Sequence, residues 1–192
     1  LWCNYIYLDT DERRRFAQVS HEYLIEQVQM QEFTGVTDGA TLKLNFNHPV
    51  KELVWVATAG TWGKVTAGCG QFTPLVKPHA STPPDGNFWQ LKLNGHDRFE
   101  KQDITYFTRY QPYKYHNNIG KSVGSFIDTI GVYSFALKPE EHQPSGTCNF
   151  SRIDNSQLIY SSLNSDLSTK PLYVYAVNYN VLRIMSGMGG LA

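Results

Sequence analysis

The chain lacks an excess of charge of either sign. Among its 192 residues, 17 Lys and Arg balance 17 Asp and Glu, so the formal net charge is 0. A protein that grips nucleic acid through its phosphates usually carries a basic excess, so we expect no direct nucleic-acid binding. Near-zero net charge also removes long-range repulsion between copies, which permits self-association.

Cysteine is scarce as well. Cys3, Cys69 and Cys148 lie far apart and form no C-x-x-C pair, which excludes zinc-ribbon and thioredoxin-like sites. We expect reduced, partly buried thiols in a protein made in a reducing compartment.

Long apolar runs are missing too. None approaches the ~20 residues needed to span a bilayer, and the first residues lack the basic region and small-residue cleavage site of a signal peptide. We therefore expect no transmembrane segment and synthesis in the cytoplasm, or a piece cut from a longer protein.

Motifs of common catalytic chemistry are also absent. The histidines form neither H-x-H nor H-E-x-x-H, and no G-x-S-x-G is present. Residues 187–190 lack the Lys-Ser/Thr pair of a phosphate loop and are predicted to be a flexible terminus. Residues 94–97, N-G-H-D, are predicted to be a turn at a strand end. We predict no catalytic, cofactor-binding or metal-ligating residue, no cofactor and no enzymatic activity. The six histidines are His21, His48, His79, His96, His116 and His142.

Two short matches have simple explanations. Residues 149–151 (N-F-S) fit a glycosylation sequon without the secretory context that it needs. Residues 13–15 (R-R-R) invite a phosphate-binding interpretation, but short runs of mixed charge usually lie in solvent. We expect the acidic residues between 9 and 12 to be their local partners.

Aromatic residues are abundant, and they favour pleated sheets. Twelve Tyr, ten Phe and four Trp make up 14% of the chain. Alternating apolar and polar residues predict about eight strands with turn signals between them. Residues 41–46 and 50–58, joined by a Pro-containing turn, form the best-supported local pair. The predicted strands are 21–29, 41–46, 50–58, 87–94, 130–137, 147–153, 157–163 and 172–185.

Helix signals are confined to one short segment. Residues 9–11 (D-T-D) offer N-cap chemistry and good helix formers follow, so we predict a helix over 11–19. Residues 1–8 are strand-like, residues 103–110 are ambiguous, and 59–86 and 111–120 are predicted loops. Many strands, little helix and long loops describe an antiparallel β-sandwich. The pattern alone does not separate a jelly roll from other sandwiches.

Residues 134–154 are the most distinctive stretch of the chain. They read S-F-A-L-K-P-E-E-H-Q-P-S-G-T-C-N-F-S-R-I-D, a strand, a proline stop, a polar turn and a second strand in a hairpin-like connection. This stretch resembles the segment typical of the major capsid protein of nucleocytoplasmic large DNA viruses, of the iridovirus and algal-virus type. Residues 8–29 and 175–192 resemble the same family.

The resemblance implies an all-β antiparallel jelly-roll sandwich that is the C-terminal half of a double jelly roll. Residues 1–8 would be the last strand of the preceding jelly roll, 9–20 a linker helix and 21–192 the C-terminal jelly-roll domain. Three copies would form a homotrimeric, pseudo-hexagonal capsomer that tiles an icosahedral shell. Its partners would be itself, neighbouring capsomers and minor capsid proteins, in virions assembled in the host cytoplasm. The loops 59–86 and 110–120 would face outward.

Two other functions remain open from the residues alone. A carbohydrate-binding β-sandwich module would use exposed Trp and Tyr side chains. A metal-dependent jelly-roll enzyme would need two or more histidines brought together.

Overall fold

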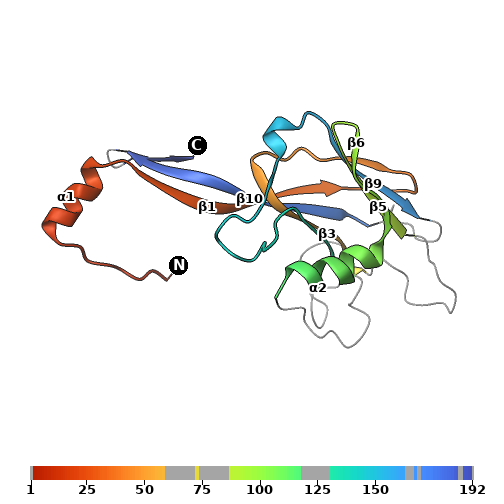
Figure 1. Cartoon of the computed structure of the whole chain (residues 1–192), viewed down its shortest axis with the longest axis horizontal. Helices are drawn as coiled ribbons and strands as arrows, with labels where there is room; N and C mark the ends of the chain where they lie inside the picture. Colours follow the sequence, from red (N-terminus) through yellow and green to blue (C-terminus); the bar gives the residue numbers. More distant parts are fainter. Residues whose placement is uncertain are drawn as a thin grey trace. The chain divides into compact units, whose positions relative to one another are not determined.

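A computed structural model describes most of the chain (Figure 1). The described residues are 2–58, 72–73, 87–117, 130–162, 167, 170–185 and 188–191. The predicted loop at 59–86 lies outside these residues except for 72–73, as do Cys69 and His79.

Antiparallel strands dominate the described residues, as predicted. Every strand pairing with a defined register is antiparallel. The strands are β1 (His21–Phe33), β2 (Thr41–Lys43), β3 (Pro49–Thr58), β4 (Phe72–Thr73), β5 (Asn87–Leu93), β6 (His96–Asp103), β7 (Ile130–Ser134), β8 (Cys148–Asn149), β9 (Ser156–Ser162), β10 (Leu172–Met185) and β11 (Met188–Leu191). The helical segments are α1 (Thr10–Gln18), the π-helix η1 (Tyr106–Tyr110), α2 (Gln111–Tyr115) and the 3-10 helix η2 (Phe150–Arg152).

The strands form two sheets. One has the order β1-β10-β3-β4, with β11 beside β10 and with β7 and β8 beside β3. The other has the order β2-β9-β5-β6. Contacts divide the chain into two compact units: unit 1 is Leu1–Gln27 with Tyr179–Ala192, and unit 2 is Val28–Asn178. The domain boundaries implied by the resemblance, after residues 8 and 20, stay a prediction.

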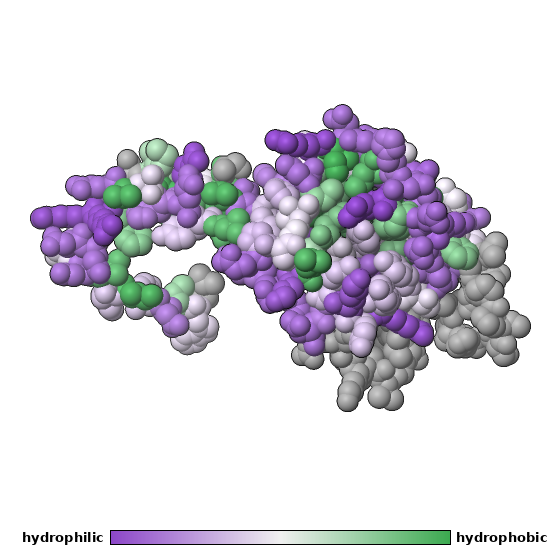
Figure 2. Space-filling view, in the orientation of Figure 1, coloured by the Kyte–Doolittle hydropathy of each residue, from purple (hydrophilic) through white to green (hydrophobic). Residues whose placement is uncertain are grey.

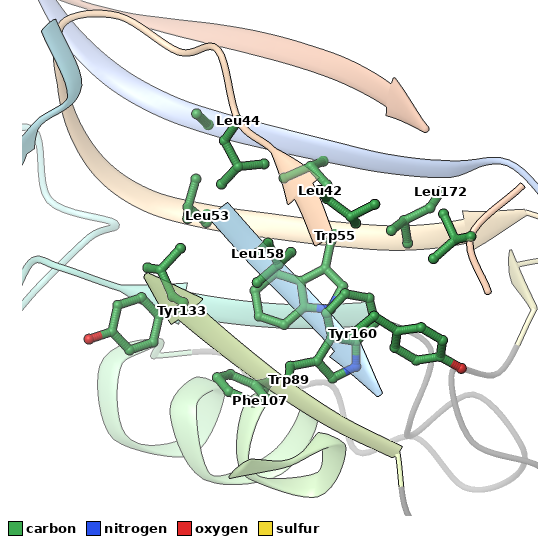
Figure 3. Packing of buried hydrophobic residues seen from close by; sticks show 14 of the residues in the cluster. Leu42, Leu44, Leu53, Trp55, Trp89, Phe107, Tyr133, Leu158, Tyr160 and Leu172 are labelled. Carbon is green, nitrogen blue, oxygen red and sulfur yellow. The ribbon is translucent and has the colours of Figure 1, made fainter. Parts of the chain in front are cut away.

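The core of unit 2 lies between its two sheets (Figure 3). Trp55 on β3 meets Trp89 on β5, with ring centroids 5.5 Å apart, and Trp89 meets Tyr160 on β9 at 4.8 Å. All three side chains are fully buried. Along β9 buried residues alternate with half-buried ones, because successive side chains of a strand point to opposite faces.

The predicted pairing of 41–46 with 50–58 is wrong. β2 pairs with β9 in one sheet, whereas β3 belongs to the other. The chain changes sheet at His48, which has a positive φ of 65°, followed by a proline. The predicted alternation is nevertheless right, because Leu42, Leu44 and Phe46 are all buried.

Residues 134–154 do not form a hairpin either. β7 and β8 both pair with β3, at neighbouring positions along the same strand: Glu52 is opposite Ser134, and Val50 is opposite Cys148. The chain between β7 and β8 therefore leaves β3 after Ser134 and pairs with it again at Cys148. The strand predicted at 147–153 ends early, because the Asn149 side chain accepts a hydrogen bond from the Ser151 backbone and caps η2.

Residues 106–110, which are ambiguous in sequence, are helical, and so are residues 111–115, for which the predicted loop is wrong. Phe107 of η1 is fully buried, and its ring centroid lies 5.2 Å from that of Trp55. Packing of this ring in the core stabilises the helical conformation of the segment. Pro112 lies in the first turn of α2, which continues directly from η1, so the proline leaves one carbonyl of the preceding turn without a backbone donor.

The two ends of the chain also depart from expectation. Residues 188–190, predicted to belong to a flexible terminus, lie in β11, where Met188 is opposite Met185 of β10. Residues 2–8, which are strand-like in sequence, carry no strand in the described part of the chain. The predicted helix is confirmed as α1.

Candidate functional site

Helix α1 of unit 1 is held at both ends. The Asp9 side chain accepts a hydrogen bond from the Thr10 N–H at 2.8 Å, which satisfies a backbone donor that the helix leaves free. At the other end the His21 ring stacks on Phe16, with centroids 4.6 Å apart, and its Nε2 lies 3.2 Å from the Phe16 carbonyl oxygen. α1 is thus fastened to the start of β1. Arg13, Arg14 and Arg15 are exposed on it, as predicted.

Polar side chains fix the strands of unit 1. The Arg183 guanidinium on β10 lies 2.7 Å from a carboxylate oxygen of Glu22 on β1. The Asn180 amide donates to Gln27 Oε1 at 3.0 Å. These contacts join β1 and β10 across residues that are far apart in sequence.

Unit 1 exposes an unusual number of large apolar side chains. In Figure 2, residues coloured green are apolar, and several of them appear at the surface of unit 1. Trp2 and Tyr7 are 103% and 93% exposed. Large contiguous apolar patches commonly mark surfaces that associate with other molecules. We call these residues the apolar set: Trp2, Tyr5, Ile6, Tyr7, Leu8, Phe16, Val19, Tyr23, Leu24, Met185, Met188 and Leu191.

In unit 2, residues 137–146 form a self-contained turn, which we call the polar turn. The Lys138 N–H donates to Ser145 Oγ at 2.9 Å, and the Lys138 ammonium pairs with Glu141 at 2.9 Å. These contacts lie within the turn and close it. Leu137 at its start is 72% exposed, so the turn presents one large apolar side chain.

No group of side chains that could hold a metal ion is found in the part of the chain that the structure describes. No three His, Cys, Asp or Glu side chains gather there as a metal ion would require. His96 begins β6 directly after a tight turn, in which Asn94 and Gly95 have φ of 51° and 80°. This confirms the predicted turn, because two residues with positive φ make the type I′ connection of a hairpin.

The cysteines differ in exposure. Cys3 is exposed, contrary to the expectation of partly buried thiols, and Cys148 is half-buried. Burial raises the pKa of the Cys148 thiol, which disfavours the reactive thiolate. Of the described helices, none is long and apolar enough to cross a membrane.

The aromatic side chains are used mainly for packing. Trp55 and Trp89 are fully buried, and Tyr133 is 8% exposed. Burial raises the pKa of Tyr133, against an opposing effect of Arg98. A carbohydrate platform built on exposed tryptophan would have Trp2 alone among the tryptophans that the structure describes. Sequence reasoning missed a further cluster around His116, which is described below.

Comparison with known proteins gives a family match over nearly the whole chain. Residues 12–190 match the family described as large eukaryotic DNA virus major capsid protein. The chain is 50% identical over 210 residues to the major capsid protein of Pyramimonas orientalis virus, and 41% identical over 239 residues to that of Paramecium bursaria Chlorella virus 1. These alignments cover 100% of this chain but 48% and 53% of the two relatives.

The fold has a close counterpart among solved structures. The crystal structure of PBCV-1 VP54 superposes with a TM-score of 0.73 at 37% identity, covering 98% of this chain and 55% of that one. This match confirms the predicted all-β jelly-roll fold. The chain therefore spans about half the length of the relatives it matches.

Proposed function

Because the chain belongs to the family of large eukaryotic DNA virus major capsid proteins, we propose that it is a shell-building part of such a protein. In this proposal copies of the full-length protein associate into trimeric capsomers with a pseudo-hexagonal outline, and the capsomers tile an icosahedral shell. The role is structural and involves no catalysis. The family match over residues 12–190 is the observation that carries it.

The apolar set of unit 1 supports this proposal. Burial of apolar surface contributes about 25 cal/mol per Å², offset by the freedom that the partners lose on association. Exposed side chains such as Met188 and Leu191, at 76% and 58%, gain that stabilisation when a partner covers them. Association between copies would bury such side chains, which is what an assembling protein requires.

We also propose the domain organisation implied by the resemblance. Residues 1–8 belong to the last strand of a preceding jelly roll, 9–20 to a linker helix and 21–192 to the second jelly roll. The relatives are about twice as long as this chain, and the described residues 2–8 are exposed. Residues 2–8 would then find their strand partners in the other half of the full-length protein.

Location and partners follow from the same proposal. The protein resides in the virion, is assembled in the host cytoplasm, and contacts neighbouring capsomers and minor capsid proteins. It does not bind the genome directly, since its 17 basic and 17 acidic residues leave no net positive charge.

Native mass spectrometry of the full-length protein tests the proposed function. We expect a trimer, because the apolar surfaces need a partner. Replacing Met188 and Leu191 by Ser in the same protein should lower the fraction of trimer, because both are exposed members of the apolar set outside residues 2–8, whereas Tyr113→Ser on α2 is the control and should leave it unchanged. A clean monomer in the unmodified protein would count against the proposal, as would specific glycan binding, which favours a carbohydrate-binding module.

Hydrogen exchange tests the domain organisation separately. In the full-length protein residues 2–8 are expected to be as protected as residues 172–182 of β10. In the 192-residue chain they are expected to exchange freely, since the proposed neighbour is missing. Free exchange of residues 2–8 in the full-length protein would show that they are not part of a jelly-roll sheet.

A further inference from the structure

A histidine between two carboxylates joins three separate parts of unit 2. His116 follows α2, Glu52 lies on β3 and Glu140 lies in the polar turn. The His116 Nδ1 is hydrogen-bonded to Glu140 Oε1 at 3.3 Å, whereas its Nε2 lies 3.3 Å from Glu52 Oε2 at ion-pair distance but outside hydrogen-bond geometry. The side chains of His116 and Glu52 are only 19% and 14% exposed. We call this arrangement the His116 bridge.

Neighbouring backbone contacts hold the bridge in place. The His116 N–H donates to the Pro112 carbonyl at 2.9 Å, which fixes the histidine to the end of α2. The Asn117 N–H donates to Glu140 Oε2 at 3.1 Å. At the other end of α2, Gln111 Oε1 accepts from the Ser134 N–H of β7. α2 is thus tied to the sheet at its start and to the polar turn at its end.

The chemistry of imidazole makes this bridge depend on protonation. A histidine ring donates from both nitrogens only in its charged form; the neutral ring has one nitrogen that accepts. Carboxylate oxygens also accept, so a neutral His116 would place a lone pair against one of the two carboxylates. The pKa of Glu140 is lowered, chiefly by the Asn117 N–H and further by His116, so this carboxylate stays charged in weak acid.

We propose that the His116 bridge is a pH-sensitive latch, which fastens the polar turn to α2 and β3 when both ring nitrogens carry a proton and loosens it when one proton leaves. The bridge therefore stabilises the attachment of the turn while both ring nitrogens of His116 carry a proton, and one of its two contacts is lost when the ring becomes neutral. On the acid side the stabilisation is lost as the pH falls far enough to protonate Glu140.

Among the described residues, the charged groups placed against His116 are Glu52 from β3 and Glu140 from the turn. The other charged pair of the turn, Lys138 with Glu141, closes the turn on itself. The polar turn can thus shift as one piece when the bridge opens, and the exposed Leu137 shifts with it. This inference does not depend on the shell-building role, because the contacts lie within one chain.

Hydrogen exchange measured by mass spectrometry on the full-length protein tests the latch. Exchange of residues 137–146 is compared at about pH 5.5 and about pH 8.0, after correction for the pH dependence of free amides. We expect opening of the turn to be roughly two- to fivefold more frequent at the higher pH, the range that corresponds to a modest ion pair. His116→Gln should abolish this difference.

Two further variants make the test specific. Glu140→Gln, at a side chain that is 39% exposed, should fold and should also abolish the difference, even if His116→Gln does not fold. His142→Gln removes the other histidine of the same turn and should leave the difference intact. The proposal is overturned by equal opening at both pH values in the unmodified protein, by a persisting difference in Glu140→Gln, or by its loss in His142→Gln.

Discussion

A Gly131→Ala variant is expected to lose about 3 kcal/mol of unfolding free energy, the upper part of the range for overpacked cores. Gly131 on β7 lies opposite Trp55 on β3. A Cβ atom at this position would lie 2.3 Å from Cε2 and 2.7 Å from Cζ2 of the Trp55 indole. The indole cannot retreat, because Trp89 and Phe107 pack against it with centroids 5.5 and 5.2 Å away. Denaturant titration of the full-length protein measures the loss.

Two variants identify the cause of that loss. Gly190→Ala places a Cβ where no atom lies within 4 Å, so its effect should stay within about 0.5 kcal/mol. Repeating Gly131→Ala in a Trp55→Phe background should cost less, because the smaller ring leaves room for the added methyl group. Equal costs in both backgrounds would show that the indole does not enforce glycine here.

Truncation of Trp89 is expected to destabilise the protein about as much as Gly131→Ala, but by leaving a cavity in the core rather than by overfilling it. Trp89→Ala removes a fully buried ring that packs against Trp55 and Tyr160. The cavity and the lost apolar burial together should cost about 3–5 kcal/mol, a large part of the stability of an ordinary domain. The melting temperature of the full-length protein reports this loss.

Tyr113→Ala is the matched control for the tryptophan, since it removes an aromatic ring that is 77% exposed on α2. Its effect should remain within about 0.5 kcal/mol. A Trp89→Ala protein that melts like the unmodified one would contradict the position of this ring at the centre of the core.

Alternation along the chain revealed which faces are buried but not which strands pair. Leu42, Leu44 and Phe46 follow a period of two, and that period alone places them inside. The partner of their strand depends on the backbone of His48, and a positive φ at a non-glycine residue leaves no trace in hydropathy. The predicted pairing of residues 41–46 with 50–58 is therefore wrong, although the predicted buried face of residues 41–46 is correct.

The sequence also contains a signal for β6 that the strand prediction did not use. Its sequence H-D-R-F-E-K-Q-D is too polar to show alternation, and most of the strand is exposed. The Asn94-Gly95 pair before it is a strong indicator of a two-residue hairpin. Combined with the strand at 87–94, it would have predicted a return strand.

Function and site were predictable to different degrees. The family could be identified from residues 134–154 with flanking stretches, and the family match agrees. The His116 bridge could not be identified from sequence. His116 is 64 positions from Glu52 and 24 from Glu140, and the three side chains meet only because α2, β3 and the polar turn lie together. Sequence motifs detect functional side chains that lie close together on one helix, strand or loop, whereas the side chains of this cluster come from three separate segments.

The hydrogen-bonding edge of β3 that faces away from β10 is covered along its whole length by short pieces of chain. β8 covers Pro49 and Val50, the backbone of residues 135–136 bonds to the Lys51 carbonyl, β7 covers residues 52–56, and β4 covers Ala57 and Thr58. An open edge of this kind would offer backbone donors and acceptors to any passing strand. This patchwork cover therefore guards β3 against unwanted edge-to-edge aggregation.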